Sequence, residues 1–480
     1  MTVTSDSYGP EVAQLSITVV DVPEAGWAQT WGGSGWEGGQ ELAVDSSDNI
    51  LVAGTYEDTV DFDPGTGTDD HTAVGGADAF LCTYDSSGGF IWALTWGGSD
   101  ADNAQAIAID GMGDIYVAGY FGATVDFDPG SGTDEHMSVG DDDAYLSKFD
   151  SSGNLLWVRT WGGVANDHAE DIAIDSMGDV YVVGSFQDTA DFDPDSDVYN
   201  LTPVGSYDVF VTKFDSTGDF QWARSWGGSM ADDCTGVVVD SSDNVWTVGT
   251  FRDTVDFDPG AGTDDHTAVG NPDIFLSELD SSGAYVMANT WGGPGSAFAR
   301  GVAINGAGAI FVAGYFSGTV DFHPGATTDD HISNGSHDAF LSRFDSSGSY
   351  NWTVTWGGVD YDDARQLAID GTNAVYVTGA FRDTVDFDPS GAFENHTSVG
   401  SDDIYVTKLD SAGNHVWARS LGSAQSDAGY SVACDSNNNV YCTGDFRETI
   451  DFEPEAGTDD HTSNGDADAF LLKYLPNAGW

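Results

Sequence analysis

The chain has 480 residues, of which 40% are apolar and 12% aromatic, so it can bury a core and is not a disordered acidic tail. Its 80 acidic residues and 13 Lys and Arg give a formal net charge of −67. This charge argues against nucleic acid or an anionic membrane surface as a partner, because such contacts require Lys and Arg. No apolar run reaches the roughly 18 residues of a spanning helix, so we expect no membrane insertion.

The first 25 residues form an N-terminal arm outside the repeats described below. Residues 1–10 lack the basic start and apolar stretch of a signal peptide, so an exported chain would have lost its leader or use another route. Residues 12–22 are predicted to form a β-strand, with Leu15, Ile17 and Val19 on one face. This strand would either pack on the edge of the chain's own sheet or pair with a neighbouring molecule. The second arrangement would make the protein a filament subunit, because head-to-tail contacts that do not close give filaments.

Residues 26–480 contain a repeat with a constant spacing of 65 residues. An Asp-Phe-x-Pro motif recurs at this spacing from Asp61 to Asp451. A Trp-Gly-Gly motif keeps the same spacing, at Trp31, Trp96, Trp161, Trp226, Trp291 and Trp356, with Leu421 in the seventh place. The chain therefore consists of seven copies of one structural unit.

Each unit is predicted to form four antiparallel β-strands. In the first unit the runs 42–45, 50–56, 78–84 and 90–96 are short and rich in β-branched or aromatic residues. Tight turns at 46–49 and 86–89 join the first strand to the second and the third to the fourth. Seven such sheets indicate an all-β fold, a seven-bladed β-propeller.

The seventh blade requires a strand from the other end of the chain. The C-terminal unit supplies three strands and ends at Trp480, where a fourth would begin. Residues 26–31 lie one period before 91–96 and are predicted to provide the missing strand. This strand would close the ring without a covalent link and remove the open sheet edges.

The motifs of the unit resemble a known family. Trp-Gly-Gly, Ala-Ile-Asp, Tyr-Val-x-Gly, Asp-Phe-Asp-Pro-Gly and Phe-Asp-Ser-Ser-Gly-Asn are similar to the bacterial seven-bladed β-propeller repeats (SBBP-type) over residues 26–480. The resemblance implies a propeller and, because the family occurs mostly in secreted or surface proteins, an extracellular or cell-surface location. It implies no shared reaction, so the function must be inferred from the site.

The face with the long connections, 57–77 and 97–105 in the first two units, is the predicted working surface. One position, expected just before the first strand of each unit, differs from blade to blade. Because the first strand lines the channel of a propeller, these residues are predicted to form a ligand-binding ring. The alternative is a set of variable, solvent-exposed loop residues. The ring consists of Gln40, Gln105, Glu170, Thr235, Arg300, Arg365 and Tyr430.

Acidic residues crowd the long connection after the second strand. Crowded carboxylates beside glycines suit a hard cation, so we predict calcium as a possible ligand of these loops. The alternative is that the first two Asp residues cap turns while the others form a solvated acidic rim. The candidate ligands are Asp61, Asp63, Asp69, Asp70, Asp126, Asp128, Asp134, Asp256, Asp258, Asp264 and Asp265.

Six histidines share one repeat position. The third unit has Leu201 there, and a position that accepts Leu is better explained by half-buried packing than by metal ligation or catalysis. The six are His71, His136, His266, His331, His396 and His461.

Three classes of function follow from the sequence. The first is a non-enzymatic extracellular or cell-surface scaffold for adhesion or self-assembly, whose partners are copies of itself, surface proteins or glycans. The second is a calcium-assisted propeller that binds a glycan or a peptide. The third is a hydrolase or lyase; no catalytic residues are assigned, and converging acids in a pocket would be needed.

Overall fold

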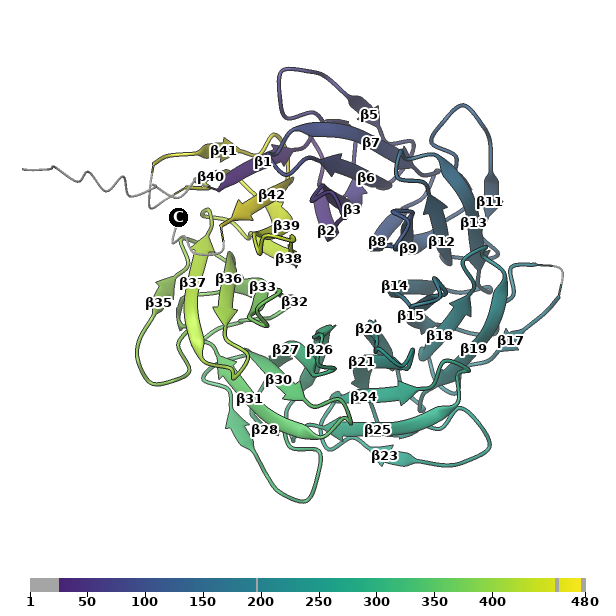
Figure 1. The fold of residues 1–480 in the computed structure, drawn as a ribbon, viewed down its shortest axis with the longest axis vertical. Helices are drawn as coiled ribbons and strands as arrows, with labels where there is room; N and C mark the ends of the chain where they lie inside the picture. The colour runs from purple at the N-terminus through teal and green to yellow at the C-terminus, as the bar shows by residue number, and fades with distance from the viewer. Residues whose placement is uncertain (1–25, 196, 454–456, 476–480) are drawn as a thin grey trace, which may run out of the picture.

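The computed structural model describes residues 26–195, 197–453 and 457–475, which contain only β-strands and connections. Seven four-stranded antiparallel sheets stand around a central axis, as Figure 1 shows. The predicted all-β, seven-bladed propeller is therefore confirmed. Within the described residues no helix is long and apolar enough to cross a membrane.

The strands occupy the same place in every blade. The innermost strands are β2 (Gly38–Val44), β8 (Asn103–Ile109), β14 (Asp167–Ile174), β20 (Asp233–Val239), β26 (Ala297–Ile304), β32 (Gln366–Ile369) and β38 (Ala428–Cys434). The second strands are β3 (Ile50–Tyr56), β9 (Ile115–Phe121), β15 (Val180–Phe186), β21 (Val245–Phe251), β27 (Ile310–Phe316), β33 (Val375–Phe381) and β39 (Val440–Phe446).

The third and outermost strands complete each sheet. The third strands are β6 (Asp78–Tyr84), β12 (Asp143–Phe149), β18 (Asp208–Phe214), β24 (Asp273–Leu279), β30 (Asp338–Phe344), β36 (Asp403–Leu409) and β42 (Asp468–Tyr474). The outermost strands are β7 (Phe90–Trp96), β13 (Leu155–Trp161), β19 (Phe220–Trp226), β25 (Tyr285–Trp291), β31 (Tyr350–Trp356), β37 (His415–Leu421) and β1 (Trp27–Trp31).

The ring is closed by the N-terminal strand. β1 pairs antiparallel with β42, in a register that sets Trp27 opposite Lys473 and Trp31 opposite Ala469. Figure 1 shows β1 and β42 in this blade. The predicted closure by residues 26–31 is confirmed. The arm strand with Leu15, Ile17 and Val19 lies outside the described residues, so its role in assembly stays a prediction.

A small hairpin, not predicted from the sequence, lies between the second and third strand of every blade and projects from the rim in Figure 1. His71 holds the first hairpin down: its Nδ1 lies 2.8 Å from Thr95 Oγ1, and its ring packs edge-on against Phe62. The predicted packing role of the histidines is confirmed. The hairpins are β4–β5 (Thr59–Asp61, Asp70–Thr72), β10–β11 (Thr124–Asp126, Glu135–Met137), β16–β17 (Ala190–Asp191, Asn200–Leu201), β22–β23 (Thr254–Asp256, Asp265–Thr267), β28–β29 (Thr319–Asp321, Asp330–Ile332), β34–β35 (Thr384–Asp386, Asn395–Thr397) and β40–β41 (Thr449–Asp451, Asp460–Thr462).

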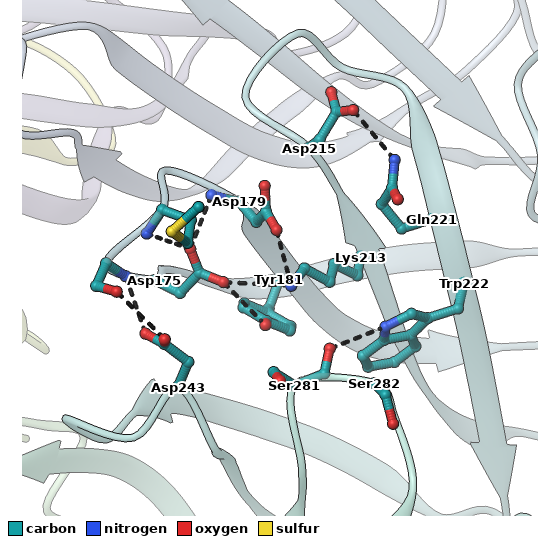
Figure 2. A network of polar contacts seen from close by, with 12 residues as sticks. Asp175, Asp179, Tyr181, Lys213, Asp215, Gln221, Trp222, Asp243, Ser281 and Ser282 are labelled. Carbon is teal, nitrogen blue, oxygen red and sulfur yellow. Dashed lines mark hydrogen bonds and ion pairs between the residues drawn. The ribbon is translucent and has the colours of Figure 1, made fainter.

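Aromatic side chains join neighbouring blades. The Trp96 ring, at 3% exposure, lies 5.6 Å from the Phe149 ring of the next blade. Near the opposite end of the outermost strands, Trp222 donates from Nε1 to the Ser281 carbonyl in the next blade, as Figure 2 shows. A Cβ on Gly283 would lie 2.9 Å from the Trp222 ring, so only glycine lets this turn approach the indole. These contacts bury the apolar faces of the blades against one another.

Candidate functional site

The seven ring residues lie on the innermost strands, at a β-bulge. In β14 the pairing with β15 shifts between Ala169 and Asp171, so that Glu170 is the extra residue. The equivalent shifts in five other blades leave one residue each without a partner on the second strand: Gln40, Gln105, Thr235, Arg300 and Tyr430. Arg365, in the remaining blade, directly precedes β32. The predicted place just before the first strand is therefore wrong for six blades, because these strands begin earlier than expected. A bulge re-aims a side chain, and here it directs the ring residues into the channel.

A recurring glycine on the second strand makes room for this bulge. A Cβ on Gly184 would lie 1.9 Å from the carbonyl oxygen of His168, and a Cβ on Gly249 equally close to that of Asp233. Real side chains do not fit at such a distance, so glycine is required where the bulged strand approaches. The glycine of the Tyr-Val-x-Gly motif therefore helps to form the ring.

The bulged side chains surround one cavity at the channel. Its volume is about 350 Å³, enough for a small ligand. Tyr361 and Asp363 complete the wall, and sequence reasoning missed both. Position 363 varies between blades as strongly as the ring position, which is the signal that could have found it. The seven predicted residues that line the cavity are Gln40, Gln105, Glu170, Thr235, Arg300, Arg365 and Tyr430. Their role in binding stays a prediction.

The two arginines of the ring differ in their partners. Arg365 Nε lies 2.9 Å from Asp363 Oδ2, and its guanidinium lies 4.9 Å from the Tyr430 ring. Arg300 is exposed in the channel; its Nη2 lies 3.3 Å from the Tyr315 hydroxyl, with no carboxylate within 4.0 Å among the described residues. Arg365 is therefore held in place, whereas Arg300 has donors available for a ligand.

Glu170 faces the same cavity from the third blade. Its Oε2 accepts a hydrogen bond of 3.2 Å from Gln105 Nε2. Burial raises the pKa of Glu170, while His168, the Gln105 hydrogen bond and Arg300 oppose this rise. The side chains that line the cavity thus include two carboxylates, two guanidinium groups, two amides and three hydroxyls. The site is polar and nearly balanced in formal charge.

An aromatic cluster borders the arginine side of the channel. The Phe298 and Tyr315 rings stack with centroids 4.7 Å apart, and Tyr361 and His337 each lie 5.5 Å from the Tyr315 ring. Tyr315 is buried, so this cluster fixes the position of the hydroxyl that contacts Arg300.

The acidic loops are organised by hydrogen bonds to the backbone. Asp61 Oδ1 accepts the amides of Asp63 and Asp69, at 3.1 and 2.8 Å, and Asp63 Oδ1 accepts the Gly65 amide. Asp126 and Asp256 make the same pair of contacts, whereas Asp70 and Asp265 are exposed. The predicted turn capping is confirmed. No group of three or more metal-ligating side chains occurs in the described part of the chain, and calcium binding stays a prediction.

Asp102 does not belong to a solvated rim. Its side chain is 1% exposed and accepts the Gly98 and Gly122 amides. Its carboxylate therefore links the connection after β7 of the first blade to the end of β9 in the second blade. Burial raises its pKa to about 7.

Two curated proteins are similar to this chain in sequence. The uncharacterized WD repeat-containing protein L264 of Acanthamoeba polyphaga mimivirus is 23% identical over 475 residues, covering 81% of this chain and 34% of that protein. Regulatory protein FlaEY of Caulobacter vibrioides is 24% identical over 376 residues, covering 72% and 37%. The chain thus spans about a third of the length of these relatives. No family model matches, so the SBBP-type resemblance is not confirmed.

Solved structures with a similar shape include the WD40 domain of Neurospora crassa Pan2. It is 10% identical, with a TM-score of 0.44, and the match covers 94% of this chain and 97% of that domain. A glucose dehydrogenase matches with a TM-score of 0.35 at 10% identity, over 93% of this chain and 99% of that one.

Proposed function

We propose that the protein is a non-enzymatic scaffold for adhesion, outside the cell or on its surface, that binds a surface glycan in the channel mouth. The cavity lined by the seven ring residues carries this proposal. Most ligand pockets are lined predominantly by apolar side chains, whereas this one offers fixed donors and acceptors on all sides. A ligand that fits it must form hydrogen bonds throughout.

The charge of the site favours a neutral ligand rich in hydroxyl groups. A net charge of −67 repels an anionic partner before it reaches the channel. Inside the cavity Asp363 already pairs with Arg365, and Glu170 accepts from Gln105. Sugar hydroxyls can both donate and accept, so they can satisfy carboxylates, amides and Arg300 together.

Binding of neutral oligosaccharides to Arg300→Ala and Thr235→Val tests this proposal. Each change removes polar atoms from the cavity wall, so we expect affinity to fall about tenfold or more, the equivalent of ~1.4 kcal/mol. A glycan array followed by calorimetry measures the effect. Met112→Ala is the matched control, because Met112 is exposed on a short turn at the other face. Equal binding by all variants, or binding by none including the wild type, contradicts the proposal.

A further inference from the structure

Buried acids meet in pairs between consecutive blades. One acid is the first residue of the third strand of a blade, and the other lies at the start of the innermost strand of the next blade or shortly before it. At the remaining junction Asp273 faces the position of Ala297 and has no second acid. The pairs, each close enough for electrostatic repulsion, are Asp78 with Asp102, Asp143 with Asp167, Asp208 with Asp232, Asp338 with Asp362, Asp403 with Asp427, and Asp468 with Glu37.

The pair of Asp143 and Asp167 shows the geometry best. The two side chains are 3% and 0% exposed. A Cβ built on Gly162 would lie 2.5 Å from Asp143 Oδ1 and 2.9 Å from Asp167 Oδ2, so both oxygens border the same point. The first glycine of the Trp-Gly-Gly motif therefore provides the space in which the two carboxyl groups meet.

One oxygen of the pair has no donor. Asp167 Oδ2 accepts from the Gly163 amide at 2.6 Å, and its Oδ1 accepts from the Gln187 amide at 3.2 Å. Asp143 Oδ2 accepts from the Val139 amide, but its Oδ1 is buried without a hydrogen-bond partner in the described structure. A buried acceptor in this state is costly. The same holds for Oδ1 of Asp78, Asp338 and Asp403 and for Oε1 of Glu37. The sixth pair differs, because Asp208 accepts the Val204 amide at Oδ2 and the Gly205 amide at Oδ1.

No cationic side chain compensates this pair. The charged groups that face it are Asp142, on the connection before β12, and His168, on β14, which pair with each other at 3.5 Å. Asp191 of β16 adjoins Gly162 through its backbone, while its carboxylate accepts two amides of its own hairpin. Two ionised carboxylates would therefore repel each other in a site that water does not reach.

We propose that the five junctions with an unpaired oxygen are proton-binding sites, in which one carboxyl group of the pair keeps a proton and donates it to the neighbouring carboxylate. The proton supplies the donor that the unpaired oxygen lacks and removes one of two repelling charges. The described residues hold no cluster of three acids that would suit a metal. At Asp273, where no second acid is present, Oδ1 instead accepts the Gly270 amide.

The proposal predicts a propeller that is more stable in mildly acidic solution. Burial raises the pKa of Asp143 to about 6 and that of Asp167 to about 7, above their ordinary value near 3.8. A group with a raised pKa in the folded state contributes stability at low pH and loses it as the pH rises through that pKa. We therefore expect the melting temperature to fall between about pH 5 and about pH 8.

Asparagine variants separate a shared proton from a bound cation. Asp143→Asn imitates the protonated acid, because its amide can donate to Asp167 while its oxygen still accepts from Val139. We expect this variant, and more so the combined Asp78, Asp143, Asp338 and Asp403 variant, to melt higher than wild type at about pH 8 and to depend less on pH. Asp273→Asn, the matched control, should melt lower, because an amide cannot replace both accepting oxygens.

The wild-type protein provides a second measurement that needs no variant. An infrared carbonyl band of protonated carboxyl groups should persist at about pH 6, where exposed acids are ionised. Absence of this band, or destabilisation by Asp143→Asn at every pH, would overturn the proposal. A melting temperature at about pH 8 that rises with calcium at constant ionic strength, but no longer rises in the combined variant, would assign the junctions to a cation instead.

Discussion

At the scale of single residues, a buried lysine pairs with the acids of the turn between the first and second strands in more than one blade. Lys213 Nζ lies 2.9 Å from Asp179 and 3.2 Å from Asp175, and it lies 4.7 Å from the centre of the Tyr181 ring, as Figure 2 shows. Asp175 also caps the turn by accepting the Met177 and Asp179 amides. The lysine therefore neutralises an acid that the turn requires. Lys148 forms the same network in the preceding blade.

Lys213→Met should destabilise the protein by about 3 kcal/mol, because removing one partner of a buried ion pair leaves the other charge uncompensated. Urea denaturation at neutral pH measures the loss. Lys473→Met is the control: Lys473 occupies the same repeat position, but its Nζ donates to the Ser86 carbonyl at an exposed site. We expect a change below about 1 kcal/mol there. Equal losses at both positions would show that packing of the side chain, and not the ion pair, is responsible.

At the scale of the strands, the sequence predicts what repeats and misses what depends on pairing. The runs 50–56 and 78–84 coincide with β3 and β6, which are buried along their whole length, and the run 90–96 coincides with the partly exposed outermost strand β7. The first strand begins earlier than predicted: the bulge at Gln40 interrupts the alternation on which its limits depend. The hairpin β4–β5 was missed because each of its strands has only three residues.

The candidate sites show the same limit. The ring from Gln40 to Tyr430 was predictable because its residues vary from blade to blade, whereas scaffold positions such as Asp61 recur in every unit. The acid pairs were not predictable, since Asp78 recurs in every unit like any scaffold residue and Asp102 stands in a polar loop. Only the fold shows that both are buried and meet between blades.

Removal of β1 should damage the whole ring. Deletion of residues 1–31 leaves the last blade with three strands and removes Trp31, which is 2% exposed and stacks 5.3 Å from the Tyr84 ring. Loss of this tryptophan alone costs about 3 to 5 kcal/mol, and the exposed edge of β42 favours aggregation. Thermal denaturation and light scattering measure both effects.

Deletion of residues 1–25 is the matched control, because it leaves β1 intact. We expect its melting temperature to equal that of the full chain. If the arm strand with Leu15, Ile17 and Val19 mediates assembly, this shorter deletion should abolish filaments in electron micrographs. A large loss of stability in the control would contradict the assignment of ring closure to β1 alone.

At the scale of the whole molecule, the net charge of −67 is distributed around the ring by the repeat. Some of the acidic residues are structural, because Asp61 and its equivalents cap turns and the acid pairs lie between blades. Other acids, including Asp70 and Asp265, are exposed on the hairpins. These exposed charges repel one another across the rim and lower the stability of the compact state.

Salt should therefore stabilise the protein. Raising NaCl from about 0.1 M to about 1 M shortens the screening length from ~10 to ~3 Å, so the repulsion between rim carboxylates falls and the free energy of unfolding rises, by more than about 1 kcal/mol. Urea denaturation at each salt concentration measures this change without adding a charged denaturant. KCl should act as NaCl does, because screening depends on ionic strength and not on the identity of the cation. CaCl2 that stabilises further at equal ionic strength, with the gain reversed by EDTA, would instead support calcium binding in the Asp61 to Asp70 loops.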